Sequence, residues 1–166
     1  AAATAGVDLS AIQRDPQRAT GVCFIVVSPS AERAFLSYRG ANAFLEPPPR
    51  SSWEGARQAH VGGHALLSGP QRDTALAFSR EAADRTLPLS LDLCLPLIDA
   101  RSAELPDILP AFDIVFANEA ELYRLVLGAG VTANAADFDG ALNAALALGA
   151  RTLVVKRGAR GATAAR

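Results

Sequence analysis

The stretch from Phe112 to Leu125, Phe-Asp-Ile-Val-Phe-Ala-Asn-Glu-Ala-Glu-Leu-Tyr-Arg-Leu, decides how the rest of the chain is interpreted. Residues 113–117 form a short apolar run typical of a buried strand, and the apolar spacing then changes to that of a helix. Asn118 stands at the junction, where a helix leaves its first N–H groups unpaired. Glu121 follows three residues later on the same face. The spacing therefore predicts a strand that runs directly into a helix, with two oxygen-bearing side chains at the junction.

Two interpretations of Asn118 and Glu121 stay open. An asparagine at the N-cap with a glutamate at the third helical position is close to a capping box, in which each side chain bonds a backbone N–H. Alternatively, both side chains face a ligand at the positively polarised end of the helix. These two residues alone do not distinguish a capping box from a ligand site, so the rest of the sequence must be considered.

Composition narrows the classes of function. The 166 residues carry a net charge of −1, and the sequence has no concentrated basic face, which argues against a nucleic-acid partner. No apolar run approaches the ~20 residues that cross a bilayer. Cys23 and Cys94 both lie in apolar, strand-like runs, so we expect two buried thiols and no disulfide. Together these features predict a cytoplasmic protein without a membrane partner.

Residues 1–50 differ from residues 51–166 in how their apolar runs and turn residues are arranged. The run 22–27 is continuously apolar, turn residues follow at 28–31, and a second apolar run at 34–38 completes a predicted β-hairpin. A strand that is apolar on both faces has to be covered on both. The hairpin is either a central part of an ordinary sheet or a lid that packs against the core or a second copy of the chain and shields a ligand. We expect residues 1–50 to form this lid with its flanking segments.

Residues 51–166 read as a partial α/β core. Short apolar runs alternate with helical patterns, which predicts βαβ units and a parallel sheet with right-handed crossovers. Ligands of such sheets bind beyond the carboxyl ends of the strands. The expected strands are 59–63, 87–92, 113–117 and 153–156, and the expected helices are 72–83, 103–109 and 137–148. The residues expected at the strand ends are small or polar: Gly62, Gly63, Asp92, Asn118 and Gly158.

Other candidate sites carry a structural and a functional reading. Gly158 and Gly161 follow the fourth strand, where they either make a tight turn or let a nucleotide approach the backbone. His60 and His64 have the spacing of a helical zinc pair, but the glycines between them disfavour a helix, so His64 is better read as a substrate contact. The triplet Gly128-Ala129-Gly130 follows a helix and is therefore no dinucleotide fingerprint.

Taken in order, three segments resemble the PfkB or ribokinase-like carbohydrate kinases. Thr20-Gly21 leads into the apolar hairpin that ends with Glu32 to Asn42, similar to the lid of that family and its return to the sugar. Asn118-Glu119-Ala120-Glu121 matches the family's Asn-x-x-Glu motif. Residues 153–161 are similar to the strand and glycine turn that meet the nucleotide.

The resemblance implies a doubly wound, mostly parallel sheet with helices on both faces and a protruding hairpin lid that joins a homodimer. It implies transfer of the ATP γ-phosphoryl group to a hydroxyl of a monosaccharide or sugar acid. In that reading Asn118 and Glu121 orient Mg²⁺ and its waters. The nucleotide would meet Asn118, Lys156, Gly158 and Gly161, and the sugar would meet Arg39, Asn42, His64 and Asp92.

Three departures qualify the resemblance. Lys156 stands where the family usually has a threonine-like residue, and Cys94 and Pro96 interrupt the Asp-x-Asn-x-Arg pattern that begins at Asp92. The Gly-Ala-Gly-Asp turn that supplies the family's catalytic aspartate does not occur in these residues. We therefore expect the middle portion of a kinase with no turnover by itself. The alternative is a non-catalytic module that binds nucleotide, sugar or a protein partner; a dinucleotide-dependent oxidoreductase is disfavoured because no glycine-rich turn follows the first strand.

Overall fold

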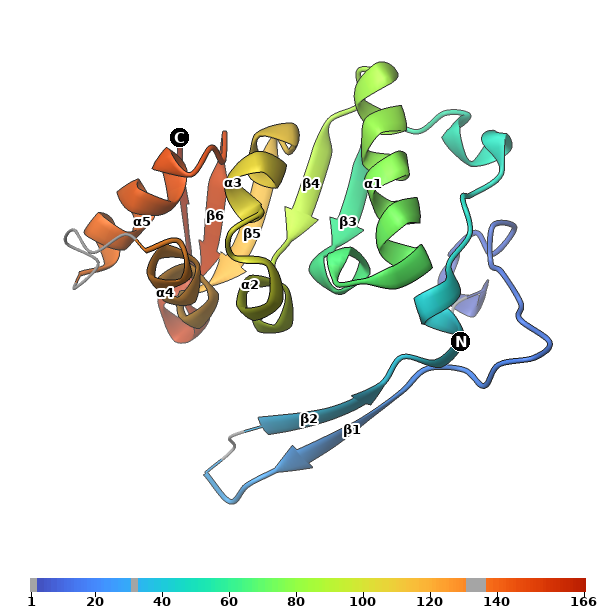
Figure 1. Ribbon diagram of the computed structural model, residues 1–166, viewed down its shortest axis with the longest axis horizontal. Coiled ribbons are helices and arrows are strands. Elements are labelled where there is room, and N and C mark those ends of the chain that lie inside the picture. Colours follow the sequence, from blue (N-terminus) through green and yellow to red (C-terminus); the bar gives the residue numbers. More distant parts are fainter. Residues whose placement is uncertain (1–2, 31–32, 131–136) are drawn as a thin grey trace.

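The computed structural model describes residues 3–30, 33–130 and 137–166, which form a five-stranded sheet and a separate two-stranded hairpin (Figure 1). The sheet has the order β3-β4-β5-β6-β7, parallel except for β7, which is antiparallel to β6. Its strands are β3 (Ala59–Gly62), β4 (Leu89–Asp92), β5 (Ile114–Asn118), β6 (Leu153–Lys156) and β7 (Ala162–Ala165). The helices between them are α1 (Gly69–Asp84), α2 (Leu95–Arg101), α3 (Leu105–Ile108), α4 (Glu119–Gly128) and α5 (Phe138–Ala147).

The parallel strands follow one another in space as they do in sequence, without a reversal of order. Because each crossover between neighbouring parallel strands has the same hand, sequential crossovers place their helices on the same face. In the described part of the chain the helices accordingly cover one face of the sheet (Figure 1). Strand residues on that face form the core, with Leu91, Val115, Ala117, Leu153 and Val155 fully buried. The mostly parallel sheet and its crossovers confirm the predicted α/β fold class, but the described helices lie on one face of the sheet where the prediction had helices on both, because the strand order does not reverse within these residues.

The hairpin of β1 (Val22–Val27) and β2 (Arg33–Tyr38) projects from the body beyond the carboxyl ends of the parallel strands (Figure 1). Its strands pair antiparallel, with Phe24 opposite Leu36 and Ile25 opposite Phe35. Every residue of both strands is exposed. The predicted hairpin is confirmed as a sheet of its own, so the reading as a central strand is wrong. The turn prediction at Ala31 and the motif position Glu32 lie outside the described residues.

Two elements differ from the sequence prediction. Helix α2 was not predicted, because Pro96 and the leucines around it obscure a helical period; the proline lies in the first turn, where no N–H is needed. Strand β7 consists of Ala-Thr-Ala-Ala, which has little intrinsic β preference and is defined by its pairing with β6. Within the described ranges, no helix is long and apolar enough to span a membrane.

Candidate functional site

Polar side chains from three neighbouring strands meet at the carboxyl edge of the sheet. Asp92 ends β4, Asn118 ends β5 and Lys156 ends β6, and Asn118 pairs with Lys156 in register. The Lys156 ammonium donates to Asp92 Oδ1 over 2.7 Å, so it reaches across β5 to the next strand but one. The predicted convergence of strand ends is present in the structure, and we call this group, with Glu121, the rim cluster.

Asn118 and Glu121 form the complete capping box of α4. The Asn118 side chain accepts from the Glu121 N–H at 2.9 Å, and Glu121 Oε2 accepts from the Asn118 N–H at 2.7 Å. This is the structural reading that the sequence left open. The capping box does not use every polar atom of the two side chains, because Glu121 Oε1 and the Asn118 amide nitrogen take no part in its two bonds.

Glu121 is a buried carboxyl group, with 8% of the residue exposed. Burial raises the pKa of the Glu121 carboxyl group above the ordinary value for glutamate, and the charge of Asp92 raises it further, although the hydrogen bonds with Asn118 and the charge of Lys156 lower it. A group of this kind is stabilised in its ionised form by any additional positive charge nearby. The rim cluster is therefore suited to a cation beside Glu121.

The glycine turn after β6 is held at the same edge by charged side chains. Gly158 and Gly161 have φ values of +57° and +79°, the left-handed region that favours glycine, so the turn reading is correct. Glu119, in the first turn of α4, accepts from Arg157 Nε at 3.1 Å and from Arg160, and the Arg157 guanidinium stacks on Phe138. A Cβ added at either glycine would meet no atom within 4 Å, so the outer side of the turn is open to a ligand.

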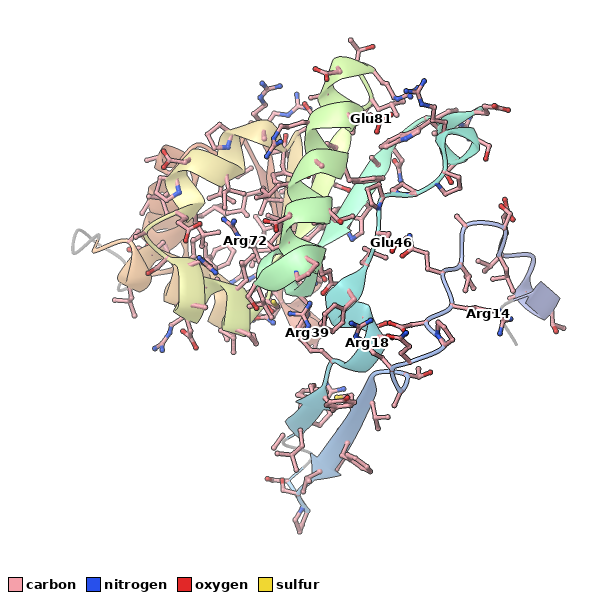
Figure 2. The ribbon with its side chains drawn as sticks, turned by 45° about the vertical axis from the view of Figure 1, so that its right-hand side comes forward. Arg14, Arg18, Arg39, Glu46, Arg72 and Glu81 are labelled. Atoms are coloured by element: carbon pink, nitrogen blue, oxygen red, sulfur yellow. The ribbon has the colours of Figure 1, made fainter. Side chains whose placement is uncertain are left out.

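The residues predicted to meet the sugar are divided between two places. Arg39, Asn42 and His64 line one cavity of about 270 Å³ at the base of the hairpin, together with Gln71 of α1. We call this the hairpin cavity. Asp92 does not line it and belongs to the rim cluster, where Lys156 binds it. Figure 2 shows Arg39 between the base of the hairpin and the amino-terminal end of α1.

A larger cavity of about 520 Å³ lies beside the amino-terminal segment, between residues 11–18 and 41–46. Asn42 lines it as well, but the rim cluster and the other predicted site residues do not. We place the site at the hairpin cavity and the rim because the chemically distinctive side chains gather there.

Several other sequence readings are resolved. His60 lies in β3 and hydrogen-bonds Ser90 at 2.8 Å, whereas His64 lies in the short 3-10 helix Gly63–Leu66, so they share no α-helical face. Over the ranges described, no three His, Cys, Asp or Glu side chains are grouped to hold a metal ion. The expectation of two buried thiols is wrong for Cys23, which is exposed on the hairpin; Cys94 is buried as expected.

Sequence reasoning missed Glu119 and Gln71. Glu119 is the second residue of the Asn-x-x-Glu motif and seemed an ordinary first-turn acid, yet it ties α4 to the turn after β6, about forty residues later. Gln71 directly follows Pro70 in the first turn of α1, and a proline at that position indicates where a helix starts but not what its neighbours contact. Neither position has a spacing that indicates its contacts, because those contacts depend on how the strands are ordered.

Comparison with protein families shows one match over the whole chain. The profile of the pfkB family carbohydrate kinases matches residues 1–166. An ATP-dependent ribose-1-phosphate kinase of Halopiger xanaduensis is 30% identical over 123 residues, which are 74% of this chain and 39% of that protein.

Solved structures with the same fold include sugar and nucleoside kinases. Adenosine kinase of Anopheles gambiae, in complex with a di-adenosine tetraphosphate, superposes with a TM-score of 0.76 at 17% identity, covering 92% of this chain and 47% of that one. Fructokinase of Vibrio cholerae, bound to fructose, ADP and calcium, gives 0.74 at 21% identity, covering 99% and 53%. The chain thus spans about half the length of these proteins.

Proposed function

The chain belongs to the pfkB family of carbohydrate kinases, and from this premise we propose that it forms part of an ATP-dependent kinase. The reaction proposed is transfer of the ATP γ-phosphoryl group to a hydroxyl group of a monosaccharide or sugar acid. ATP dependence is supported by the name of the Halopiger relative, which is an ATP-dependent kinase of a sugar phosphate.

The observation that carries the proposal is the rim cluster. Asp92, Asn118, Glu121 and Lys156 come from three strand ends and one helix start, and they are connected by hydrogen bonds and an ion pair. Phosphoryl transfer requires mainly the positioning of charged groups and the neutralisation of spread negative charge. A buried carboxyl group, a lysine and the amino end of the ten-residue helix α4 provide such a setting.

The residues present fit Mg²⁺ bound mostly through water and phosphate. Mg²⁺ keeps several of its waters and needs one or two protein carboxylates. Glu121 has one carboxylate oxygen outside the capping box, and the described residues offer no three-ligand protein cage. When bound, the ion would neutralise charge on the transferred phosphoryl group. Glu121 and Asn118 would orient its waters.

The remaining roles follow from position. Lys156 would act as a point charge toward the nucleotide phosphates after release from Asp92, and Gly158 and Gly161 would let the nucleotide approach the backbone. On the sugar side, Arg39, Asn42 and His64 would contact the acceptor in the hairpin cavity, and Asp92, which lies outside that cavity, would meet it from the rim cluster. The hairpin would act as a lid over the sugar, excluding water, and would join two copies of the chain.

Calorimetric titration of the protein with ATP and Mg²⁺ tests this proposal. We expect a saturable heat that is weaker when Mg²⁺ is omitted, because the metal carries the charge compensation between Glu121 and the phosphates. The variant E81Q serves as a control, since Glu81 pairs with Arg85 at the carboxyl-terminal end of α1, the end far from the hairpin (Figure 2), and its loss should leave nucleotide binding unchanged. No saturable heat from the wild-type protein would overturn the kinase assignment.

A second candidate is a non-catalytic module that binds nucleotide or sugar, or only a protein partner. It is favoured by one observation: the 166 residues contain no Gly-Ala-Gly-Asp turn to take the proton of the acceptor hydroxyl. We expect this chain alone to bind ATP without sugar-dependent release of ADP. A coupled ADP assay with a panel of sugars checks this, and sugar-dependent turnover would contradict it.

A further inference from the structure

Glu119 binds two arginines at the start of α4, although it is not one of the residues expected in the site. Its Oε1 atom accepts from Arg157 Nε at 3.1 Å, and its other carboxylate oxygen accepts from Arg160. Because guanidinium groups engage both oxygens, Glu119 is not available to join Glu121 as a magnesium ligand. Its contacts instead connect the helix to the turn at residues 157–161.

The two ion pairs of Glu119 differ in how far water reaches them. The side chains of Glu119 and Arg157 are 23% and 22% exposed, whereas that of Arg160 is 65% exposed. The Arg157 guanidinium also lies over the ring of Phe138, the first residue of α5, at 3.7 Å from the ring centroid. An exposed pair contributes little because water and salt screen it, whereas a partly buried pair is costly to break. The Glu119–Arg157 pair is therefore the stronger of the two.

The turn 157–161 depends on such side-chain contacts because its own strands give it little anchorage. It joins β6 to β7, and in the described sheet β7 pairs only with β6, as the last strand in the order. Three of the four side chains of β7 are methyl groups, so this strand buries little apolar area. The Arg157 N–H bonds the Gly161 carbonyl, which closes the turn on itself without attaching it to the helices. The ion pair with Glu119 and the contact with Phe138 attach it to α4 and α5.

We propose, on the premise of the function proposed above, that Glu119 and Arg157 are positioning residues that set the affinity for the nucleotide without touching it. Their ion pair fixes the glycine turn relative to the amino end of α4, where the rim cluster lies. A nucleotide that approaches the backbone at Gly158 and Gly161, with its phosphates at the rim cluster, has to meet both surfaces at once. Surfaces that are held in place beforehand lose less conformational freedom on binding, so the ligand binds more tightly.

A second ion pair on the same two strands provides a matched control. Asp113 directly precedes β5 and Arg151 lies just before β6, and they pair at the amino-terminal edge of the sheet over 3.1 Å. Both this pair and Glu119–Arg157 join residues 38 positions apart, so the control perturbs the same strands from their other ends. Its loss can lower stability but should leave the position of the glycine turn unchanged.

Two double-mutant cycles test the proposal, E119Q with R157Q and D113N with R151Q. Each protein is titrated by calorimetry with ATP and Mg²⁺, and its stability is measured in parallel by urea unfolding. We expect E119Q and R157Q each to weaken ATP binding about fivefold, and the double variant to bind no more weakly than either, because all three lose the same ion pair. The D113N–R151Q cycle should leave ATP affinity unchanged. R160Q should change it by less than about twofold, because it removes only the exposed pair.

Amide hydrogen exchange provides a readout that needs no ligand. The N–H groups of Arg160 and Gly161 are hydrogen-bonded within the turn, so their exchange reports on how firmly the turn is held. Exchange should be about fivefold faster in E119Q and R157Q than in the wild-type protein, and unchanged in R151Q. If R157Q does not fold, E119Q gives the same test.

The inference is overturned by any of three results: additive losses of ATP affinity in the E119Q–R157Q cycle, an equal loss in R160Q, or wild-type exchange rates in E119Q. A purely structural ion pair would give coupling in urea unfolding but none in ATP affinity, which also overturns it. Failure of the inference alone leaves ATP binding by the wild-type protein intact. A wild-type protein that binds no ATP refutes the kinase proposal itself, so the two failures are distinguished.

Discussion

Glu121 has a structural bond and a candidate chemical role, and a single substitution separates them. Glutamine also completes a capping box, so E121Q keeps the bond to the Asn118 N–H while it removes the charge. We expect the free energy of unfolding to stay within about 0.5 kcal/mol of wild type. Affinity for ATP with Mg²⁺ should fall about tenfold, as a charge-assisted contact is lost. By contrast, N118A should lower stability by about 1 kcal/mol through loss of the cap. Unchanged Mg²⁺-dependent binding in E121Q would leave Glu121 with only its capping role.

The raised pKa of Glu121 predicts how stability depends on pH. An acid with a higher pKa in the folded than in the unfolded state binds more protons when folded, so its contribution to stability falls as pH rises from 4.5 through the folded pKa. E121Q lacks this titration. The free energy of unfolding of E121Q relative to wild type should therefore increase over that interval, measured by urea unfolding at a series of pH values without Mg²⁺. A constant difference would show that burial does not raise the pKa of this carboxyl group.

At the scale of elements, the role of the glycine turn after β6 can be tested by comparing it with a second glycine that also has a positive φ. Gly158 and Gly130 both have positive φ, and a Cβ would meet no atom within 4 Å at either position. Both G158A and G130A should therefore lose about 1–2 kcal/mol of stability from backbone strain alone. Only G158A should also weaken nucleotide binding, by about tenfold, because a methyl group would stand where the nucleotide approaches the backbone. Chemical denaturation and calorimetry measure the two effects. Equal nucleotide affinity in both variants would reduce Gly158 to a turn residue.

The same scale shows what the sequence could predict. Residues 153–156 were predicted with the observed bounds, because an apolar run of strand length stands between turn residues. The junction at Asn118 was also predictable, since capping chemistry is local. The pairing of Lys156 with Asp92 was not, because it joins residues 64 positions apart and depends on strand order. For the same reason the sequence could not show that Asp92 lies apart from Arg39, or that Gln71 joins the hairpin cavity.

At the scale of the whole molecule, the exposed apolar residues of the hairpin predict an interaction partner. An isolated two-stranded hairpin is marginally stable in water, and contiguous exposed apolar surface marks an interaction site. Phe24 and Leu36 are 67% and 64% exposed and lie opposite each other in register. Both edges of this sheet are unpaired within the described structure, so a second hairpin could add to it by strand pairing or by apolar packing.

We expect the protein to be a dimer in sedimentation equilibrium and the double variant F24D/L36D to be a monomer, because buried charge is unfavourable at an apolar interface. The core should stay folded in this variant, since both side chains are exposed on the hairpin and absent from the buried core. L127D is the matched control: Leu127 is 64% exposed but lies on α4, so its replacement should leave the dimer intact.

If the hairpin is also the lid of the hairpin cavity, F24D/L36D should bind the acceptor sugar more weakly while its binding of ATP with Mg²⁺ is unchanged. A monomeric wild type, or equal dissociation in L127D, would show that the hairpin is covered by something other than a second copy.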